Sequence, residues 1–164
     1  MKTKKVAMLG LTITLAMIMS YIEALVPLSF AVPGIKMGLA NIVVIFVLYK
    51  FGTKDAILVS LIRVILVSLL FSGFMAMAYS LSGAVLSLLV MWLLKKIDKF
   101  SVIGVSVAGG VMHNVGQIIM AIILLRTEQI AIYLPVLILT GTVTGVIIGI
   151  VSGLVINRFK NIKI

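Results

Sequence analysis

The chain contains no cysteine, and it is poor in acidic groups and in helix-breaking proline. Among its 164 residues are four Asp or Glu, one His, one Trp and three Pro. Without cysteine, it can form no disulfide, no thiolate metal site and no thiol nucleophile. Charged residues make up only 11% of the chain, too few to cover the surface of a water-soluble protein of this length. These absences point away from secreted disulfide-rich domains and from soluble enzymes.

Apolar residues are abundant instead, at 63% of the chain with a mean hydropathy of +1.35. A helix needs about 20 residues to cross a hydrocarbon core of about 30 Å. An open sheet cannot satisfy its edge hydrogen bonds in lipid, so we predict an all-α, polytopic fold in one integral membrane domain over residues 1–164. Interruptions at charged residues, Pro and Gly predict six transmembrane helices, near residues 6–27, 37–51, 55–71, 73–94, 101–125 and 130–156.

Two parts of this assignment of six spans have less support from the sequence than the others. The second span is short for a full crossing of the bilayer. The third and fourth spans are separated only by residues 71–73, Phe-Ser-Gly, which contain no charge. We interpret this segment as a tight reversal of the chain.

The basic residues predict the orientation of the chain in the membrane. If the N-terminus is inside, the outer loops hold only Lys36 and Arg126, and Arg63 lies within a span. The other basic residues then lie on the inner side: Lys2, Lys4, Lys5, Lys50, Lys54, Lys95, Lys96, Lys99, Arg158, Lys160 and Lys163. This bias predicts a multi-pass protein of the cell membrane with both termini in the cytoplasm. Because the charges are spread between apolar stretches and form no patch, no nucleic-acid partner is expected.

Several polar residues interrupt the predicted spans, where ionisable and amide groups usually mark functional sites. On the fifth span, His113 and Gln117 share a helical face, and Asn114 lies beside them. Two roles are possible for these residues: they form a hydrogen-bonded contact between helices, or they line a cavity. No metal site is expected, because no Cys, second His or nearby carboxylate would complete a coordination shell.

Arg63 lies in the middle of the third span, where an uncompensated guanidinium costs roughly 2.5–3.5 kcal/mol. It therefore needs a carboxylate, backbone carbonyls or an anionic ligand. Asp55 is the first residue of the third span, so Glu23 is the only acid predicted to lie inside a span and not at its end. A structural pair between these residues and a ligand-binding role for Arg63 are equally open alternatives.

A loop rich in Pro and Gly precedes the second span and contains Lys36, with Asn41 following at the start of that span. Helix-terminal N–H groups there are able to receive an anion, although a plain loop with an extended lysine is equally consistent. Tyr79 is either an interfacial aromatic or part of the same site. We predict a substrate-binding pocket, open to the outer side and without catalytic residues, formed by Glu23, Lys36, Asn41, Arg63, Tyr79, His113, Asn114 and Gln117.

Three motifs, together with Arg63, resemble a known family: PGIKMGLAN at residues 33–41, YSLSG at 79–83 and HNVGQ at 113–117. The family is heptaprenyl diphosphate synthase component I, also called the Gx transporter family. The resemblance implies a fold similar to the S components of energy-coupling factor transporters, which are six-helix importers of vitamins and related compounds. It also implies separate ATPase and transmembrane coupling subunits as partners, since the chain contains no Walker A motif.

Two functions follow from these observations. The first is a substrate-binding membrane subunit of an importer for a small, vitamin-like molecule. The alternative is a non-catalytic membrane partner of heptaprenyl diphosphate synthase in isoprenoid or quinone synthesis. An enzyme is not expected, because prenyl diphosphate chemistry needs paired aspartates for Mg²⁺ and both Asp55 and Asp98 are isolated. No cofactor is expected.

Overall fold

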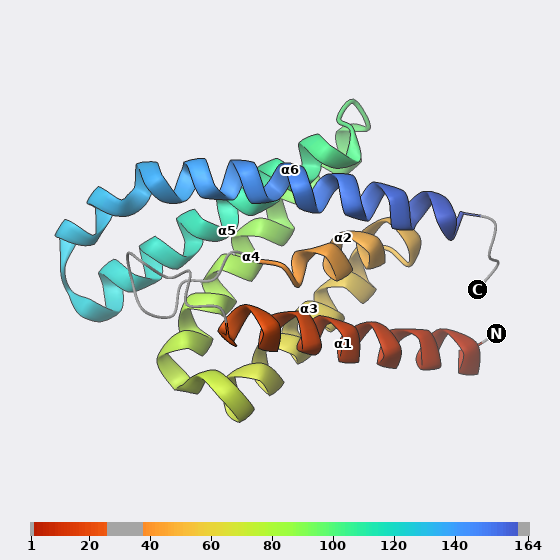
Figure 1. Ribbon diagram of the computed structural model, residues 1–164, viewed down its shortest axis with the longest axis horizontal. Coiled ribbons are helices and arrows are strands. Elements are labelled where there is room, and N and C mark those ends of the chain that lie inside the picture. Colours follow the sequence, from red (N-terminus) through yellow and green to blue (C-terminus); the bar gives the residue numbers. More distant parts are fainter. Residues whose placement is uncertain (1, 26–37, 161–164) are drawn as a thin grey trace.

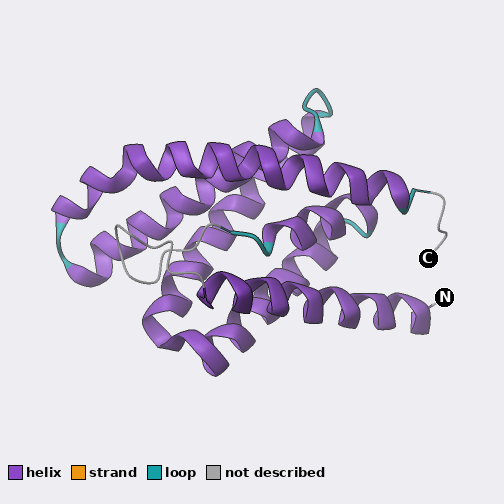
Figure 2. Cartoon of the chain, in the orientation of Figure 1, coloured by secondary structure: helices purple, strands orange, loops and turns teal. Residues whose placement is uncertain are grey.

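The computed structural model describes residues 2–25 and 38–160, and every element in these ranges is helical. Figure 2 shows the helices as purple ribbons and the described turns in teal. A π-helical turn, η1 (Ser68–Ser72), and a 3₁₀ helix, η2 (Glu128–Tyr133), connect longer elements. The α-helices are α1 (Lys2–Leu25), α2 (Asn41–Lys50), α3 (Thr53–Val67), α4 (Gly73–Ile97), α5 (Val102–Leu125) and α6 (Leu134–Arg158).

Each predicted span corresponds to one α-helix, but the prediction of six crossings is not confirmed. In the described part of the chain, four helical segments are long and apolar enough to cross a membrane: Thr3–Glu23, Thr53–Ile97, Val102–Leu125 and Glu128–Arg158. The segment Thr53–Ile97 combines α3, η1 and α4, which follow one another without a loop. With ten residues, α2 is about 15 Å long and reaches about half-way through a hydrocarbon core.

The chain changes direction between α3 and α4 at Gly73, within the predicted reversal (Figure 1). Gly73 has φ +77° and ψ 175°, outside the helical region. A backbone with positive φ favours glycine, which has no Cβ to clash with its own carbonyl groups. The π-helical turn directly before it widens the end of α3. This arrangement allows a reversal without a polar loop.

The short helix α2 is apolar because other helices enclose it. Val44, Ile45, Val47 and Leu48 are all nearly inaccessible. The carbonyl group of Leu48 accepts a hydrogen bond from Lys95 Nζ at 2.5 Å, close to the end of the helix. Such bonds satisfy the last carbonyl groups of a helix, which have no partner within it. The helix is therefore a buried half-helix that ends at polar anchors.

Close packing of α4, α5 and α6 depends on glycine. A Cβ at Gly145 would lie 2.7 Å from Val107 Cα, and one at Gly149 would lie 2.7 Å from Ile103 Cα. Gly145 and Gly149 of α6 thus face α5 within the same chain. Gly153 has no such neighbour within 4 Å. Glycine at these contacts allows the helix backbones to approach closely, as in other membrane bundles.

Both terminal helices reach the same end of the bundle (Figure 1). At the start of α1, Lys5 forms an ion pair of 2.7 Å with Asp55. At the end of α6, Phe159 O accepts a hydrogen bond of 2.7 Å from Lys50 Nζ. Lys50 and Asp55 flank the short turn between α2 and α3, so both terminal helices are attached to that turn. Lys5 and Lys50 thus lie together at one end of the bundle.

Candidate functional site

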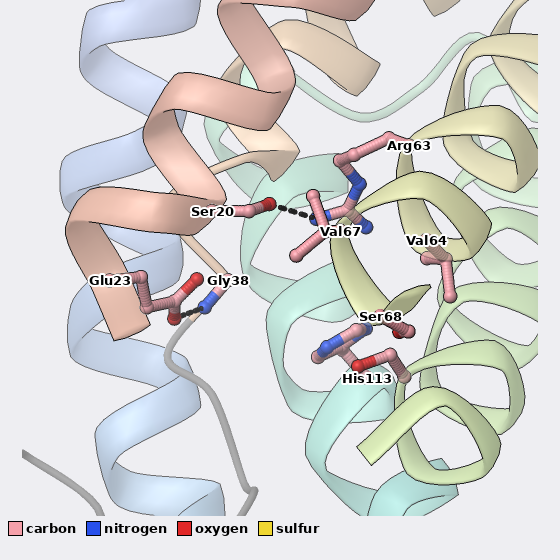
Figure 3. Close-up of a pocket in the computed structure, with 9 residues that line it drawn as sticks. Ser20, Glu23, Gly38, Arg63, Val64, Val67, Ser68 and His113 are labelled. Carbon is pink, nitrogen blue, oxygen red and sulfur yellow. Dashed lines mark hydrogen bonds between the residues drawn. The ribbon is translucent and has the colours of Figure 1, made fainter. Parts of the chain in front are cut away.

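A buried polar cavity lies where α1, α3, α4, α5 and the residues before α2 meet (Figure 3). Its volume of about 10 Å³ is roughly enough for one water molecule. Charged, hydroxyl and imidazole groups lie around it, although the surrounding helices are apolar. The lining residues are Ser20, Glu23, Gly38, Arg63, Val64, Val67, Ser68, Ser80 and His113.

Arg63 supplies the positive charge of the cavity. It lies ten residues after the start of α3, about 15 Å into the bundle, and only 5% of its surface is exposed. Its Nη1 donates a hydrogen bond of 3.2 Å to Ser20 Oγ on α1. Its Nε has no hydrogen-bond partner among the described residues. A buried guanidinium normally uses its donors fully, so this free N–H is available to a ligand or a water molecule.

Glu23 supplies a negative charge from the end of α1. The side chain is buried, and its carboxylate accepts a hydrogen bond from the backbone N–H of Gly38 (Figure 3). That contact brings the end of α1 to the chain segment that leads into α2. The cavity therefore contains one cationic and one acidic side chain, from different helices.

The segment that leads into the half-helix α2 reaches the same cavity through Gly38. Gly38 lines it with φ +89°, a conformation that favours glycine, and a Cβ there would lie 2.9 Å from Asn41 Nδ2. Asn41 is itself buried and donates its backbone N–H to Gly38 O at 2.8 Å. In many transporters, interrupted helices place their N-termini at a substrate site in this way.

His113 reaches the cavity from α5, beside Ser68 (Figure 3). A Cβ at Gly83 would lie 2.7 Å from His113 O and 2.9 Å from its Nδ1, so only glycine permits this approach of α4. Ser80, one turn before Gly83, also lines the cavity. Its Oγ has no hydrogen-bond partner among the described residues.

The structure thus brings together Glu23, Arg63 and His113 from the predicted set, and it places Asn41 against a lining residue. Gln117 is fully buried one turn beyond His113, where its Cγ would lie 3.0 Å from a Cβ at Gly83. Neither polar atom of its amide has a hydrogen-bond partner among the described residues. It extends the polar face of α5 beyond the cavity without lining it.

Tyr79 and Asn114 lie away from the cavity. Asn114 Nδ2 donates a hydrogen bond of 2.7 Å to Leu137 O, which makes it a contact between α5 and α6. Tyr79 packs in an apolar cluster with Ile118 and Leu137. One residue rotates a helix by about 100°, so Tyr79 faces away while its neighbour Ser80 lines the cavity. Lys36 lies outside the described residues.

The predicted site omitted six of the lining residues. Three of them carry hydroxyl groups, Ser20, Ser68 and Ser80, and the others are Gly38, Val64 and Val67. Ser20 precedes Glu23 by three positions, so both lie on one face of α1, and this spacing was a usable signal. Ser68 follows Arg63 by five positions, and it lines the cavity where α3 gives way to the π-helical turn η1. Helical periodicity alone does not predict that placement.

A comparison with known protein families decides the affiliation. The family model of heptaprenyl diphosphate synthase component I matches residues 12–155. The chain belongs to this family. The match includes every residue that lines the cavity, and it confirms the resemblance seen in the sequence motifs. No curated protein and no solved structure matches the chain significantly.

Proposed function

We propose that this member of the family is a substrate-binding integral membrane subunit of an importer for a small, vitamin-like molecule. The observation that carries the proposal is the convergence of Glu23, Arg63 and His113, from three helices, on one buried cavity. Ionisable side chains inside a membrane bundle are costly, and they usually serve a substrate or ion pathway. Packing alone would be served better by apolar residues of similar volume.

The cavity favours a ligand with an anionic or electron-rich group. Arg63 Nε is a donor on a cationic group, and it has no hydrogen-bond partner among the described residues. The acidic side chain of Glu23 suits a donor group on the same ligand. Because the cavity holds about one water molecule, a vitamin-sized ligand requires the surrounding helices to move apart. Differential affinity for an open state would drive that change.

The arrangement also suggests how such a subunit would face the membrane. The end of the bundle that carries the ion pair Lys5–Asp55 and the anchors Lys50 and Lys95 would lie in the cytoplasm. Arg63 and His113, about 15 Å from that end, then lie near the middle of the bilayer, and Glu23 lies nearer the outside. Separate ATPase and transmembrane coupling subunits would supply the energy, since the sequence contains no Walker A motif.

The family's description favours a second candidate, a non-catalytic membrane partner of heptaprenyl diphosphate synthase. An enzymatic role for the chain itself has less support. Asp55 is engaged with Lys5, and Asp98 is the residue that ends α4. Within those ranges, no three His, Cys, Asp or Glu side chains are grouped to hold a metal ion.

Affinity purification combined with solute uptake separates the two candidates. Arg63→Gln and His113→Ala remove cavity groups, and Arg158→Gln is the matched control at the end of α6. For an importer subunit, the cavity variants abolish uptake by proteoliposomes that contain the coupling subunits, whereas the control leaves it unchanged. A stable complex with a prenyl synthase that survives both cavity substitutions, with no uptake by the wild type, would support the scaffold instead.

A further inference from the structure

An apolar groove runs between α3 and α4 on the surface of the bundle. Its volume is about 320 Å³, and among the described residues that line it Thr53 alone has a hydroxyl, amide or charged side chain. Several lining side chains are well exposed, among them Val85 and Leu89. The lining residues are Thr53, Ile57, Leu61, Ala84, Val85, Leu88, Leu89 and Trp92.

The groove has the length and depth of a single leaflet. On α3 the lining residues Thr53 and Leu61 are eight residues apart, and on α4 Ala84 and Trp92 are also eight residues apart. Eight helical residues span about 12 Å. Half of a hydrocarbon core of about 30 Å is about 15 Å. The groove therefore begins at the lysine-rich end and ends near the middle of the membrane.

Two exposed lysines lie on α3 and α4 within one helical turn of groove residues. Lys54 directly follows Thr53, the first groove residue of α3. Lys96 Nζ lies 5.6 Å from the centre of the Trp92 ring, which itself lines the groove. Neither lysine forms an ion pair with an acid in the described ranges, where Asp55 is engaged by Lys5. Lys95 is directed elsewhere, to Leu48 O.

We propose that this groove is a binding site for an anionic phospholipid. One acyl chain lies along the groove, and the headgroup phosphate lies between Lys54 and Lys96. Basic pockets between transmembrane helices bind anionic headgroups in this way, and a tryptophan at the mouth suits the interfacial region. A partner helix about 10 Å wide would occupy roughly 900 Å³ over the same length, so the groove is too small to enclose one. The site is independent of the central cavity and of the proposed transport function.

Native mass spectrometry of the purified full chain tests the proposal. Delipidated protein is offered phosphatidylglycerol and phosphatidylcholine with identical acyl chains. We expect wild-type protein to retain phosphatidylglycerol preferentially. Lys54→Gln and Lys96→Gln should each weaken its retention about fivefold, as expected for one lysine at an anionic surface. Lys160→Gln, the same change on an exposed lysine beyond α6, should leave retention unchanged.

Two further arms separate the headgroup from the acyl chain. Val85→Trp fills the groove without altering charge, and it should also abolish the preferential retention. Glycerol phosphate, which has the charge but no acyl chain, should not compete. Equal retention by wild type, Lys54→Gln and Lys96→Gln would overturn the proposal, as would an equal loss in Lys160→Gln. The proposal would also be overturned if glycerol phosphate competed, or if a folded Val85→Trp variant retained the lipid as well as wild type. Either result would exclude the contact between the groove and the acyl chain.

Discussion

At the scale of single residues, the molecule concentrates its unusual chemistry on Glu23, Arg63 and His113. Each is buried in a bundle that consists mainly of apolar helices. Arg63 has one direct hydrogen bond, to Ser20, and one donor without a partner in the described ranges. Removal of one member of a buried charged pair leaves the other uncompensated, and this usually costs more than removal of both. The three residues should therefore behave as a coupled group.

A double-mutant cycle measures this coupling. We expect Arg63→Met and Glu23→Gln each to lower the free energy of unfolding. In the double variant, the decrease in the free energy of unfolding should be about 1–3 kcal/mol smaller than the sum of the two single decreases. The reason is that neither charge is then left without its partner. Denaturation of the purified variants in detergent provides the values. Strict additivity would show that the two charges do not interact.

At the scale of the elements, glycine contacts and polar anchors determine how the helices pack. The half-helix α2 is enclosed by the other helices and held near its end by Lys95, whose Nζ lies 2.5 Å from Leu48 O. Along α6, Gly145 and Gly149 contact the backbone of α5, whereas Gly153 has free space. The α3–α4 reversal depends on the positive φ of Gly73. These contacts hold the helices around the cavity in place.

Alanine at two glycines of α6 separates packing from helix propensity. Gly145→Ala should destabilise the fold by about 1–3 kcal/mol, because its Cβ would meet Val107 Cα at 2.7 Å. Gly153 lies on the same face of α6, eight residues after Gly145, and nothing lies within 4 Å of a Cβ at this position. Gly153→Ala should therefore leave the stability unchanged or increase it by up to about 1 kcal/mol. Thermal unfolding of both variants tests this. Equal effects would mean that the close contact does not matter.

The anchor of α2 gives a second prediction at this scale. Lys95→Met removes the donor to Leu48 O and should lower the free energy of unfolding by about 1–3 kcal/mol, the usual cost of a buried carbonyl left without a partner. Lys99→Met is the control, because Lys99 is exposed in the turn after α4. If the two variants are equally stable, Lys95 does not support α2.

At the scale of the whole molecule, the charge distribution predicts an orientation in the membrane. Lys5, Lys50 and Lys95 all make their contacts at the end of the bundle where both terminal helices meet. Arg126 lies at the opposite end of α5, in the turn before η2. An anionic inner leaflet and the positive-inside rule favour a cytoplasmic location for the lysine-rich end.

The absence of cysteine allows a direct test of orientation, because single introduced thiols have no background. With a membrane-impermeant maleimide on intact cells, we expect labelling of Arg126→Cys. Lys99→Cys should react only after the membrane is permeabilised. The reverse pattern would invert the proposed topology.

Much of this architecture could be predicted from the sequence, and the exceptions have physical causes. Hydropathy located all the helices, and the reversal near Gly73 was predicted from its Phe-Ser-Gly segment. Hydropathy does not distinguish a helix that lipid surrounds from one that protein surrounds, so α2 resembled a crossing. Among the site residues, depth alone grouped Tyr79 and Asn114 with His113. Rotation about the helix axis, which requires the packed structure, directs Tyr79 and Asn114 into other contacts.

The central claim is that Arg63 holds a solute in the cavity, and mass spectrometry of small molecules released from gently purified protein tests it most directly. The account predicts one compound bound to wild-type protein and to Arg158→Gln. In Arg63→Gln, its amount should fall at least about tenfold, the cost of one hydrogen bond to a charged group. Equal amounts of the compound in wild type and a folded Arg63→Gln variant, or no compound in any sample, would contradict the account.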